Sequence, residues 1–320
     1  LENIATLHTD NPWLEKRRAK LLFQVGQYCE RSAELALAEA IYRGCTYPGA
    51  RARLIRVLER QEDFAQAMRL AREAQLAPES AAEQQHLLRV IPRLGRKLGE
   101  PAVPRVKPRE IVRLDLELPA PEPLMSVEYC VQAHLSDHGA PVHYVENSLI
   151  NSLFGLLCWP AIFAPLPGSF FHPFQRGPVD LHSEDFHQRR AELFAACLDQ
   201  LGDERYKATI RQRYVDKWGI QSPFVFWNVL SEELLDQALD CLPAVHLRRW
   251  FERLLLDIRA NRAGMPDLIQ FWPEEKTYRM IEVKGPGDRL QDNQLRWLEF
   301  CGEHQMPVTV CYVRWAEQVA

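Results

Sequence analysis

The sequence has 320 residues, of which 47% are hydrophobic, 26% charged and 10% aromatic. This length and composition allow sizeable cores in two or more domains and exclude an intrinsically disordered chain. The net charge of −4 is unevenly spread, because residues 1–113 hold 20 Lys and Arg against 14 Asp and Glu, residues 114–245 hold 8 against 18, and residues 246–320 hold 11 of each. A basic N-terminal third suits contact with a polyanion, although asymmetry of this size is common.

The eight cysteines are scattered, with no C-x-x-C pair. Structural zinc sites and disulfide frameworks use clustered or regularly spaced cysteines, so we expect reduced and mostly buried thiols. No signal peptide opens the sequence, and the longest apolar stretch, residues 153–168, is interrupted by three prolines. We therefore predict a soluble protein without membrane contact, cytoplasmic and nucleoid-associated in a bacterium or nuclear in a eukaryote.

Residues 12–99 are typical of consecutive amphipathic helices. Small residues recur in the second helix of each predicted pair: Ala67, Ala71 and Ala74 before Pro78, and less regularly Ala36 and Ala40 before Pro48. This spacing favours a tetratricopeptide-like (TPR-like) layer, in which small residues let two helices approach closely, although alanine-rich hairpins without repeat ancestry have the same pattern. The basic residues of these helices suit either a solvated face or a surface that holds a phosphate backbone, among them Arg18, Arg51, Arg53, Arg56, Arg60 and Arg93.

Residues 101–123 are rich in proline, through which helices cannot continue. We interpret this stretch as a linker, or as an extended segment wrapped on a neighbour, and place a domain boundary near residue 120. Helices resume with Ser126 as an N-cap, and a later helix is predicted to begin at Ser183. Glu146 lies at the expected entry to an apolar helix, where a carboxylate complements the helix dipole. From the residues alone, this ordinary explanation of Glu146 is the better one.

Residues 246–264 predict one amphipathic helix that carries five arginines and ends at Gly264. It leads directly into Pro266 and Asp267. A β-rich run, DLIQFW, follows and is separated by the turn PEEK from a second run, TYRMIEVKG. These residues predict a hairpin of two short strands.

Alternate side chains of a strand share one face, so Glu282 and Lys284 should point together while Ile281 and Val283 point to the core. Asp267, fifteen positions before Glu282 (282 − 267), begins the paired strand and can come alongside them. Two carboxylates and an ammonium then converge at one place. A lone E-x-K is a weak signal, but the upstream Pro-Asp pair and the predicted hairpin make chance a poorer explanation.

This group of residues suits metal-assisted hydrolysis of a phosphodiester. Asp and Glu oxygens are hard ligands for Mg²⁺, and the carbonyl of Val283 is a candidate for a further oxygen. A bound cation would acidify a water and neutralise charge on the phosphate. Lys284 would orient or help to deprotonate that water, or stabilise the negative transition state.

A helix and a strand are predicted after the hairpin, and the order helix–strand–strand–helix–strand is that of the PD-(D/E)xK restriction-endonuclease-like core. The stretches GMPDLI and IEVKGPGDRLQDNQLRW closely resemble the VRR-NUC nuclease domain, and the wider chain resembles the Fanconi-anaemia-associated nuclease family. The resemblance is strongest over residues 246–314. It implies a mainly α chain with a C-terminal α/β domain: a TPR-like region at 1–120, a helical region at 121–245 that contributes to the nuclease domain, and the VRR-NUC core at 246–320 with a mixed sheet flanked by helices.

The resemblance also implies the activity: a structure-specific DNA nuclease that needs Mg²⁺ or Mn²⁺, cuts near 5′ flaps, has 5′-to-3′ exonuclease activity and acts in interstrand crosslink repair. Its partner would be branched DNA, bound by a monomer. The catalytic motif of the family maps onto Asp267, Glu282 and Lys284, and Gln294 matches the glutamine that follows it. The upstream acidic metal ligand of the family maps onto Glu146, which replaces the helix-dipole explanation.

Family members are further expected to hold a terminal 5′ phosphate in a basic pocket. Arg259, Arg262 and Arg289 are the nearest candidates for DNA binding. Some relatives carry a lysine where this chain has Asn293, which weakens the expected phosphate anchor. The N-terminal DNA-binding region of the family is expected only in part, because the sequence starts at Leu1.

Two alternatives remain at this point. A Holliday-junction-resolving nuclease would use the same domain as a dimer, whereas a large helical region favours asymmetric flaps and a monomer. A helical-repeat scaffold with an inactive nuclease domain is the third hypothesis. It is disfavoured because all four positions, Glu146, Asp267, Glu282 and Lys284, keep chemically competent side chains.

Overall fold

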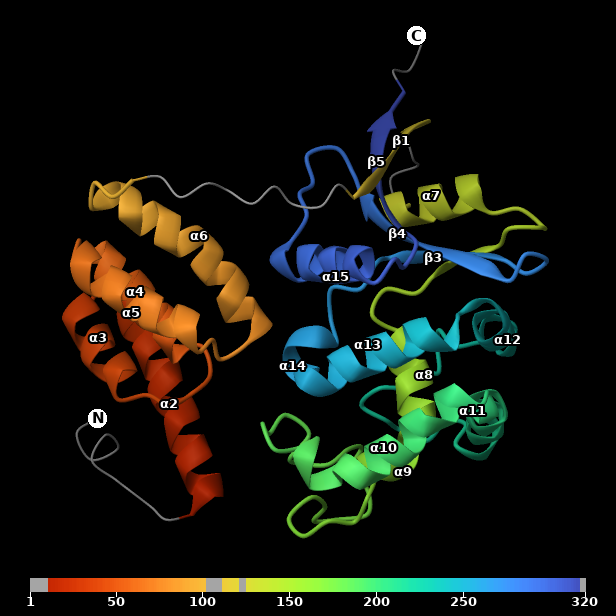
Figure 1. The fold of residues 1–320 in the computed structure, drawn as a ribbon, viewed down its shortest axis with the longest axis horizontal. Coiled ribbons are helices and arrows are strands. Elements are labelled where there is room, and N and C mark those ends of the chain that lie inside the picture. The colour runs from red at the N-terminus through yellow and green to blue at the C-terminus, as the bar shows by residue number, and fades with distance from the viewer. Residues whose placement is uncertain (1–10, 102–110, 121–124, 317–320) are drawn as a thin grey trace. The chain divides into compact units, whose positions relative to one another are not determined.

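A computed structural model describes residues 11–101, 111–120 and 125–316. The chain divides into two compact units, residues 1–107 and 108–320 (Figure 1). Within the described ranges, no helix is both long enough and apolar enough to cross a membrane.

The first unit consists of helices that pack on one another in chain order: α2 (Pro12–Arg31), α3 (Leu35–Arg43), α4 (Ala50–Arg60), α5 (Phe64–Leu76) and α6 (Ala81–Lys97). The predicted helical layer is confirmed. Ala67, Ala71 and Ala74 are fully buried on α5, as the close-approach pattern requires. On α3 the pattern was misplaced, because Ala38 is buried while Ala36 and Ala40 are exposed.

Several arginines of this unit bind acidic groups of the same unit. Glu30 is buried, and its carboxylate lies 3.2 Å from a guanidinium nitrogen of Arg53 and 3.0 Å from one of Arg56. Glu83 is likewise buried and binds Arg51 at 2.6 Å. Because a buried carboxylate without a partner is costly, these arginines stabilise the helical layer itself. These arginines are therefore not simply residues of a solvated helix face.

The second unit is built on a five-stranded sheet with the order β1-β5-β4-β3-β2. The strands are β1 (Val112–Leu118), β2 (Val142–Tyr144), β3 (Leu268–Trp272), β4 (Thr277–Lys284) and β5 (Val308–Trp315). β5 runs parallel to both of its neighbours, β1 and β4, whereas β3 runs antiparallel to both β4 and β2. The predicted order helix–strand–strand–helix–strand is confirmed, since the β3–β4 hairpin follows a helix and α15 (Asp292–Glu303) connects it to β5.

The proline-rich stretch is partly a strand of this sheet. β1 pairs along its whole length with β5, from Val112 opposite Thr309 to Leu118 opposite Trp315. The first unit therefore ends at Lys107, and not near residue 120. Residues 112–118 of the proline-rich stretch are indeed an extended segment that packs on a neighbour, because their backbone pairs with β5 at the edge of the sheet. The remaining parts, 102–110 and 121–124, lie outside the described residues.

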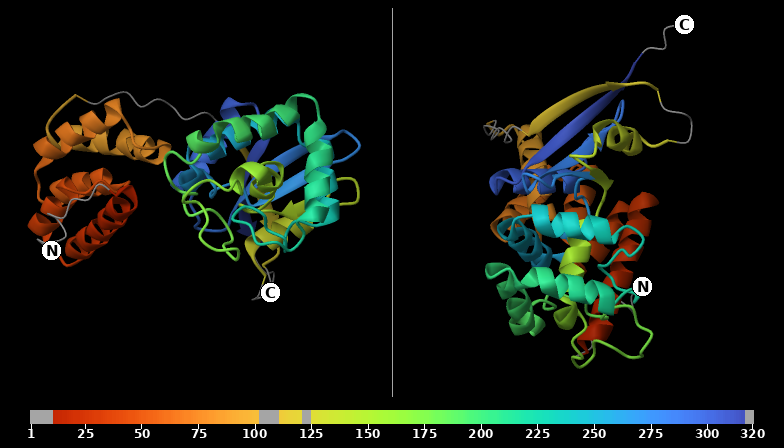
Figure 2. Two further views of the ribbon diagram at one scale, coloured as in Figure 1. Left: turned by 90° about the horizontal axis from the view of Figure 1, so that it is seen from below. Right: turned by 90° about the vertical axis from the view of Figure 1, so that its right-hand side faces the viewer.

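Helices cover both faces of the sheet (Figures 1 and 2). Ile281 and Val283 pack with Val131 of α7 on one face, and Met280 joins the larger core on the opposite face. The helical segments of the unit are α7 (Val127–Leu135), α8 (Leu149–Leu157), α9 (Trp159–Ile162), η1 (Gln188–Arg190), α10 (Ala191–Asp199), η2 (Gln200–Gly202), α11 (Arg205–Asp216), α12 (Glu232–Cys241), α13 (Ala244–Leu256), α14 (Ile258–Asn261) and α15.

Two predicted helix boundaries were wrong. The helix expected over residues 246–264 is two helices, because Asp257 adopts an extended conformation and its side chain caps α14 by accepting from the Ala260 N–H at 2.9 Å. The helix expected to begin at Ser183 begins only at Ala191, after a 3₁₀ turn. Turns occupy the intervening residues.

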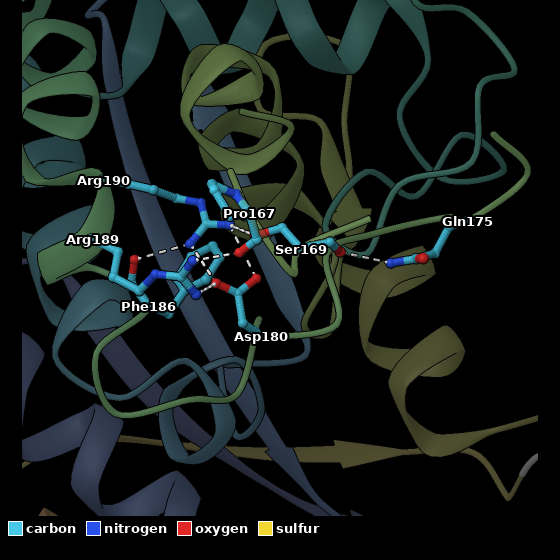
Figure 3. A network of polar contacts seen from close by, with 7 residues as sticks. All are labelled: Pro167, Ser169, Gln175, Asp180, Phe186, Arg189 and Arg190. Carbon is cyan, nitrogen blue, oxygen red and sulfur yellow. Dashed lines mark hydrogen bonds and ion pairs between the residues drawn. The ribbon is translucent and has the colours of Figure 1, made fainter. Parts of the chain in front are cut away.

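A buried ion pair holds those turns in place (Figure 3). Arg190 is only 1% exposed, and its guanidinium donates to both carboxylate oxygens of Asp180, at 2.8 and 3.0 Å. It also donates to the Ser169 hydroxyl at 2.8 Å, while Arg189 binds Asp180 at 2.7 Å. Burial works to raise the pKa of Asp180, but the hydrogen bonds and charge of Arg190 outweigh it, so the pKa lies below its ordinary value.

Candidate active site

The predicted acidic pair meets where β3 begins and β4 ends. Leu268 pairs with Ile281, and the same antiparallel register continued by one residue places Asp267 opposite Glu282. Directly opposite residues of an antiparallel pair share one face of a sheet. Both carboxyl groups are buried, with 6% of Asp267 and 0% of Glu282 exposed.

Hydrogen bonds fix both side chains. One oxygen of Asp267, Oδ2, accepts from the Val283 N–H at 2.8 Å. Glu282 Oε1 accepts from the Lys284 ammonium at 2.7 Å, and Lys284 is only 7% exposed. The prediction that Glu282 and Lys284 point together is therefore confirmed, as is the packing of Ile281 into the core on the other face.

The environment disfavours negative charge on both carboxyl groups. Burial raises the pKa of Asp267 to about 6; the Val283 N–H lowers it and the charge of Glu146 raises it further. Burial also raises the pKa of Glu282 to about 8, with Asp267 adding repulsion and Lys284 opposing it. Two buried carboxylates with a single neighbouring ammonium call for more positive charge than the described residues supply.

Glu146 reaches the same place from a distant part of the chain. It lies in the turn between β2 and α8, because Ser148 is the N-cap and α8 begins at Leu149. The predicted helix entry was therefore slightly too early, and Glu146 is outside the helix. Its negative charge raises the pKa of both Asp267 and Glu282, so the three carboxyl groups lie within electrostatic reach of one another.

These residues fit a divalent cation. Glu282 Oε2 is buried and has no hydrogen-bond partner among the described residues, which leaves this oxygen available to bind a cation. Val283 donates its N–H toward Asp267, and the N–H and carbonyl of one strand residue point to the same side, so the Val283 carbonyl also points toward the Asp267 side. In the described residues no three acidic, His or Cys side chains are already gathered as a ligand set.

Gln294 has a helix-capping role. It lies in the first turn of α15, and its side-chain oxygen accepts from the Gln291 N–H at 2.8 Å. This contact closes the N-terminus of the helix that follows the hairpin.

The predicted DNA-binding arginines differ in their surroundings. Arg259 and Arg289 are exposed. Arg262 instead donates to the Pro223 carbonyl at 2.8 Å and is half-buried, which lowers the pKa of its guanidinium. Asn293 packs closely on Gly264, whose φ of +93° is open to glycine but strained for other residues.

Three polar neighbours of the carboxyl groups escaped the sequence analysis. The Tyr144 hydroxyl donates to Glu146 Oε2 at 2.6 Å, and the Asn147 amide donates to Oε1 at 3.2 Å. Glu128, in the first turn of α7, adds negative charge that raises the pKa of Asp267. The three polar residues Tyr144, Glu146 and Asn147, just before an apolar helix, were the available signal. Nothing in the local pattern connects Glu128 to the hairpin.

Comparison with known proteins identifies relatives of this chain. Residues 201–315 match the VRR-NUC domain family. The chain is 65% identical over 305 residues, 95% of its length, to a Fanconi-associated nuclease 1 homolog of Pseudomonas aeruginosa, and covers 55% of that protein. It is 32% identical over 199 residues to human Fanconi-associated nuclease 1, and this alignment covers 59% of this chain and 19% of the human protein.

A solved structure shares the fold. The crystal structure of paFAN1 bound to a 2-nucleotide 5′-flap DNA with a gap superposes with a TM-score of 0.95 at 63% identity, over 98% of this chain and 58% of that one. A second paFAN1 structure, bound to a 1-nucleotide 5′-flap DNA with a gap, gives a TM-score of 0.93. The chain thus spans a little over half the length of its bacterial relatives. The resemblance and fold class predicted from the sequence are confirmed.

Proposed function

We propose that this chain, which carries a VRR-NUC domain and is a relative of the Fanconi-associated nuclease 1 homologs, acts as a divalent-metal-dependent, structure-specific DNA nuclease. The observation that carries the proposal is the buried pair Asp267 and Glu282 beside Lys284, with one oxygen of Glu282 left without a partner among the described residues. Strongly perturbed pKa values cluster at functional sites.

Glu146, Asp267, Glu282 and the Val283 carbonyl would hold the cation, and its oxygen ligands favour Mg²⁺ or Mn²⁺. When bound, the cation supplies Lewis acidity, which activates a water and neutralises charge on the phosphate. The chain keeps both carboxyl groups out of water, and burial raises their pKa values, so a nearby positive charge would stabilise their ionised forms. The Val283 N–H fixes the Asp267 carboxylate, so that group does not need to reorient.

Lys284 supplies the second positive charge. Its Nζ lies 2.7 Å from Glu282 Oε1 and is held by a buried strand, so it is preorganised beside the carboxyl groups that would hold the cation. We assign to it the orientation of the attacking water and stabilisation of the negative transition state. Gln294 supports the site indirectly, by capping the helix that follows the motif.

Branched DNA with a 5′ flap is the proposed substrate, because the structurally similar paFAN1 was crystallised on such DNA. The proposal includes 5′-to-3′ exonuclease activity and a role in interstrand crosslink repair, and it takes the enzyme to act as a monomer. Arg259 and Arg289 are the proposed phosphate contacts, since both are exposed in the unit that holds the site. The bond of Arg262 to Pro223 leaves this residue a structural role.

The test is a cleavage assay with an end-labelled 5′-flap duplex and a four-way junction, in Mg²⁺, in Mn²⁺ and in EDTA. We expect flap cleavage with either cation, none in EDTA, and none with Asp267→Asn. This variant keeps an oxygen that accepts from the Val283 N–H, so it should fold. Asp137→Asn is the matched control, because Asp137 also accepts backbone N–H groups, at 2.8 Å, but is exposed and away from the site.

The outcomes separate the alternatives. Cleavage in EDTA, or undiminished cleavage by Asp267→Asn, would refute the metal-dependent mechanism. Symmetric nicking of the four-way junction with little flap cutting would favour a junction-resolving nuclease. Absence of cleavage by the wild-type chain on every substrate, with both cations, would favour an inactive scaffold.

A further inference from the structure

The turn that carries Glu146 is tied to the strand that carries Asp267 by an extension of the sheet. Tyr144 is the last residue of β2 and pairs with Leu268. One residue further, the Val145 N–H donates to the Asp267 carbonyl at 2.8 Å. The chain then turns away into α8, yet the Met265 N–H still finds an acceptor, because the side-chain oxygen of Asn147 lies 3.0 Å from it. An asparagine side chain thus takes the place of the next backbone carbonyl.

The same side chain also holds Glu146. The Asn147 amide nitrogen donates to Glu146 Oε1 at 3.2 Å while its oxygen accepts from Met265. Only one orientation of the amide satisfies both contacts, since the flipped amide would oppose a nitrogen to an N–H and an oxygen to a carboxylate. The backbone conformation fits too, because Asn147 has φ +52°, a left-handed conformation that asparagine tolerates better than most residues.

The backbone of this turn is fixed from the helix side as well. The Asn151 side chain, which is fully buried, donates to the Asn147 carbonyl at 2.7 Å and to the Arg262 carbonyl at 2.9 Å. Asn147 is therefore held between α8 and the segment that leads into Asp267. Each of these contacts of Asn147 is made within the chain.

We propose that Asn147 is a positioning residue of the metal site: it locks the Glu146 turn to the Met265–Asp267 segment, so that ligands 121 positions apart in the sequence (267 − 146) are presented together. This inference rests on the proposed function, in which Glu146 and Asp267 hold one cation. Groups that orient metal ligands change metal affinity by about 10–100-fold when they are removed. Asn147 is not expected to touch substrate.

The experiment is calorimetric titration of the cation-free protein with Mn²⁺, without DNA. Asn147→Gly removes both side-chain contacts without backbone strain, and we expect its Kd for Mn²⁺ to rise by about 10–100-fold. Lys276→Gly is the matched control. Lys276 has nearly the same backbone conformation, φ +51°, but lies exposed in the β3–β4 turn at the other end of the hairpin. Its Kd should equal that of the wild type.

A double-mutant cycle with Glu146→Gln distinguishes positioning from a general loss of structure. If Asn147 acts through Glu146, then Asn147→Gly should weaken Mn²⁺ binding in the wild-type background and have little further effect in the Glu146→Gln background. Wild-type affinity in Asn147→Gly, or an equal loss in both backgrounds, would overturn the inference while leaving the proposed function intact. No Mn²⁺ binding by the wild type would instead overturn the proposed function, and the inference with it.

Discussion

Asp267 should destabilise the cation-free protein, and its neutral isostere should relieve that cost. The pKa of Asp267 rises from an ordinary 3.8 to about 6 because the carboxyl group is buried. At 1.36 kcal/mol per pKa unit, ionisation of Asp267 then costs up to about 3 kcal/mol of unfolding free energy. Asp267→Asn removes the charge and keeps an acceptor for the Val283 N–H, so it should stabilise the second unit by about that amount.

The pH dependence has a definite sign. A carboxyl group whose folded pKa exceeds its unfolded pKa stabilises least when it is ionised, so the cost is absent below about pH 3.8, grows through pH 6 and is complete above it. We therefore expect equal stability of wild type and Asp267→Asn near pH 4, and an advantage of the variant at pH 8. For a unit of 213 residues (320 − 107), about 3 kcal/mol corresponds to roughly 6–12 °C in Tm.

The assay is thermal unfolding in EDTA between pH 4 and pH 8, with Asp137→Asn as the exposed control, which should change stability by less than about 0.5 kcal/mol. Mg²⁺ at about 1,000 times its Kd should reverse the order, because it stabilises the wild type by about 4.1 kcal/mol, which exceeds the cost of ionised Asp267, and it stabilises the variant much less. If Asp267→Asn is no more stable than the wild type at pH 8 in EDTA, ionised Asp267 carries no such cost in the folded protein.

Two further changes test the frame around the site. Gly264→Ala places a Cβ 2.8 Å from the backbone of Asn293 at a φ of +93°, and it should lower the unfolding free energy, measured by urea titration, by about 1–3 kcal/mol or more. Gly287→Ala is the control for backbone strain alone, because Gly287 has φ +87° and no described atom lies within 4 Å of its added Cβ. Equal losses in the two variants would refute the clash with Asn293. Asp180→Asn leaves the buried Arg190 without its anionic partner and should lower the unfolding free energy by about 3–5 kcal/mol at neutral pH. This difference should shrink in acid, because the wild type loses the stabilisation by ionised Asp180 as the pH falls through the lowered pKa of that group. A loss below about 1 kcal/mol at neutral pH would contradict the prediction.

The hairpin was predictable because its signals are local. A two-residue period places Glu282 and Lys284 on one face, and the turn between the runs fixes the antiparallel partner of that face. Asp267 then follows from the register. The depth of burial was not predictable, because the E-x-K sequence pattern is the same on an exposed strand and on the central strand of a sheet.

The rest of the site depends on contacts between distant segments. Glu146 preceded an apolar helix and had an ordinary local explanation, and only the family resemblance connected it to Asp267. The strand β1 was hidden by its proline-rich flanks, although VRLDLEL alternates apolar and polar residues as an edge strand does. The structural bond of Arg262 to Pro223 required knowledge of where a loop about 40 residues upstream (262 − 223 = 39) would pack.

The positions of β4 and β2 in the sheet imply that the segments carrying Glu282 and Glu146 separate from the sheet at different rates. β4 is hydrogen-bonded on both sides, so Glu282 can leave only when several strands separate. β2 is three residues long and lies at the edge, so its detachment breaks few backbone bonds besides the contacts of Asn147. Proteins open first at such places, in small fluctuations that leave the core folded. A cation that shared Glu146 and Asp267 would therefore have an exit and an entrance at the sheet edge, and its exchange would follow the fraying of β2 rather than global unfolding.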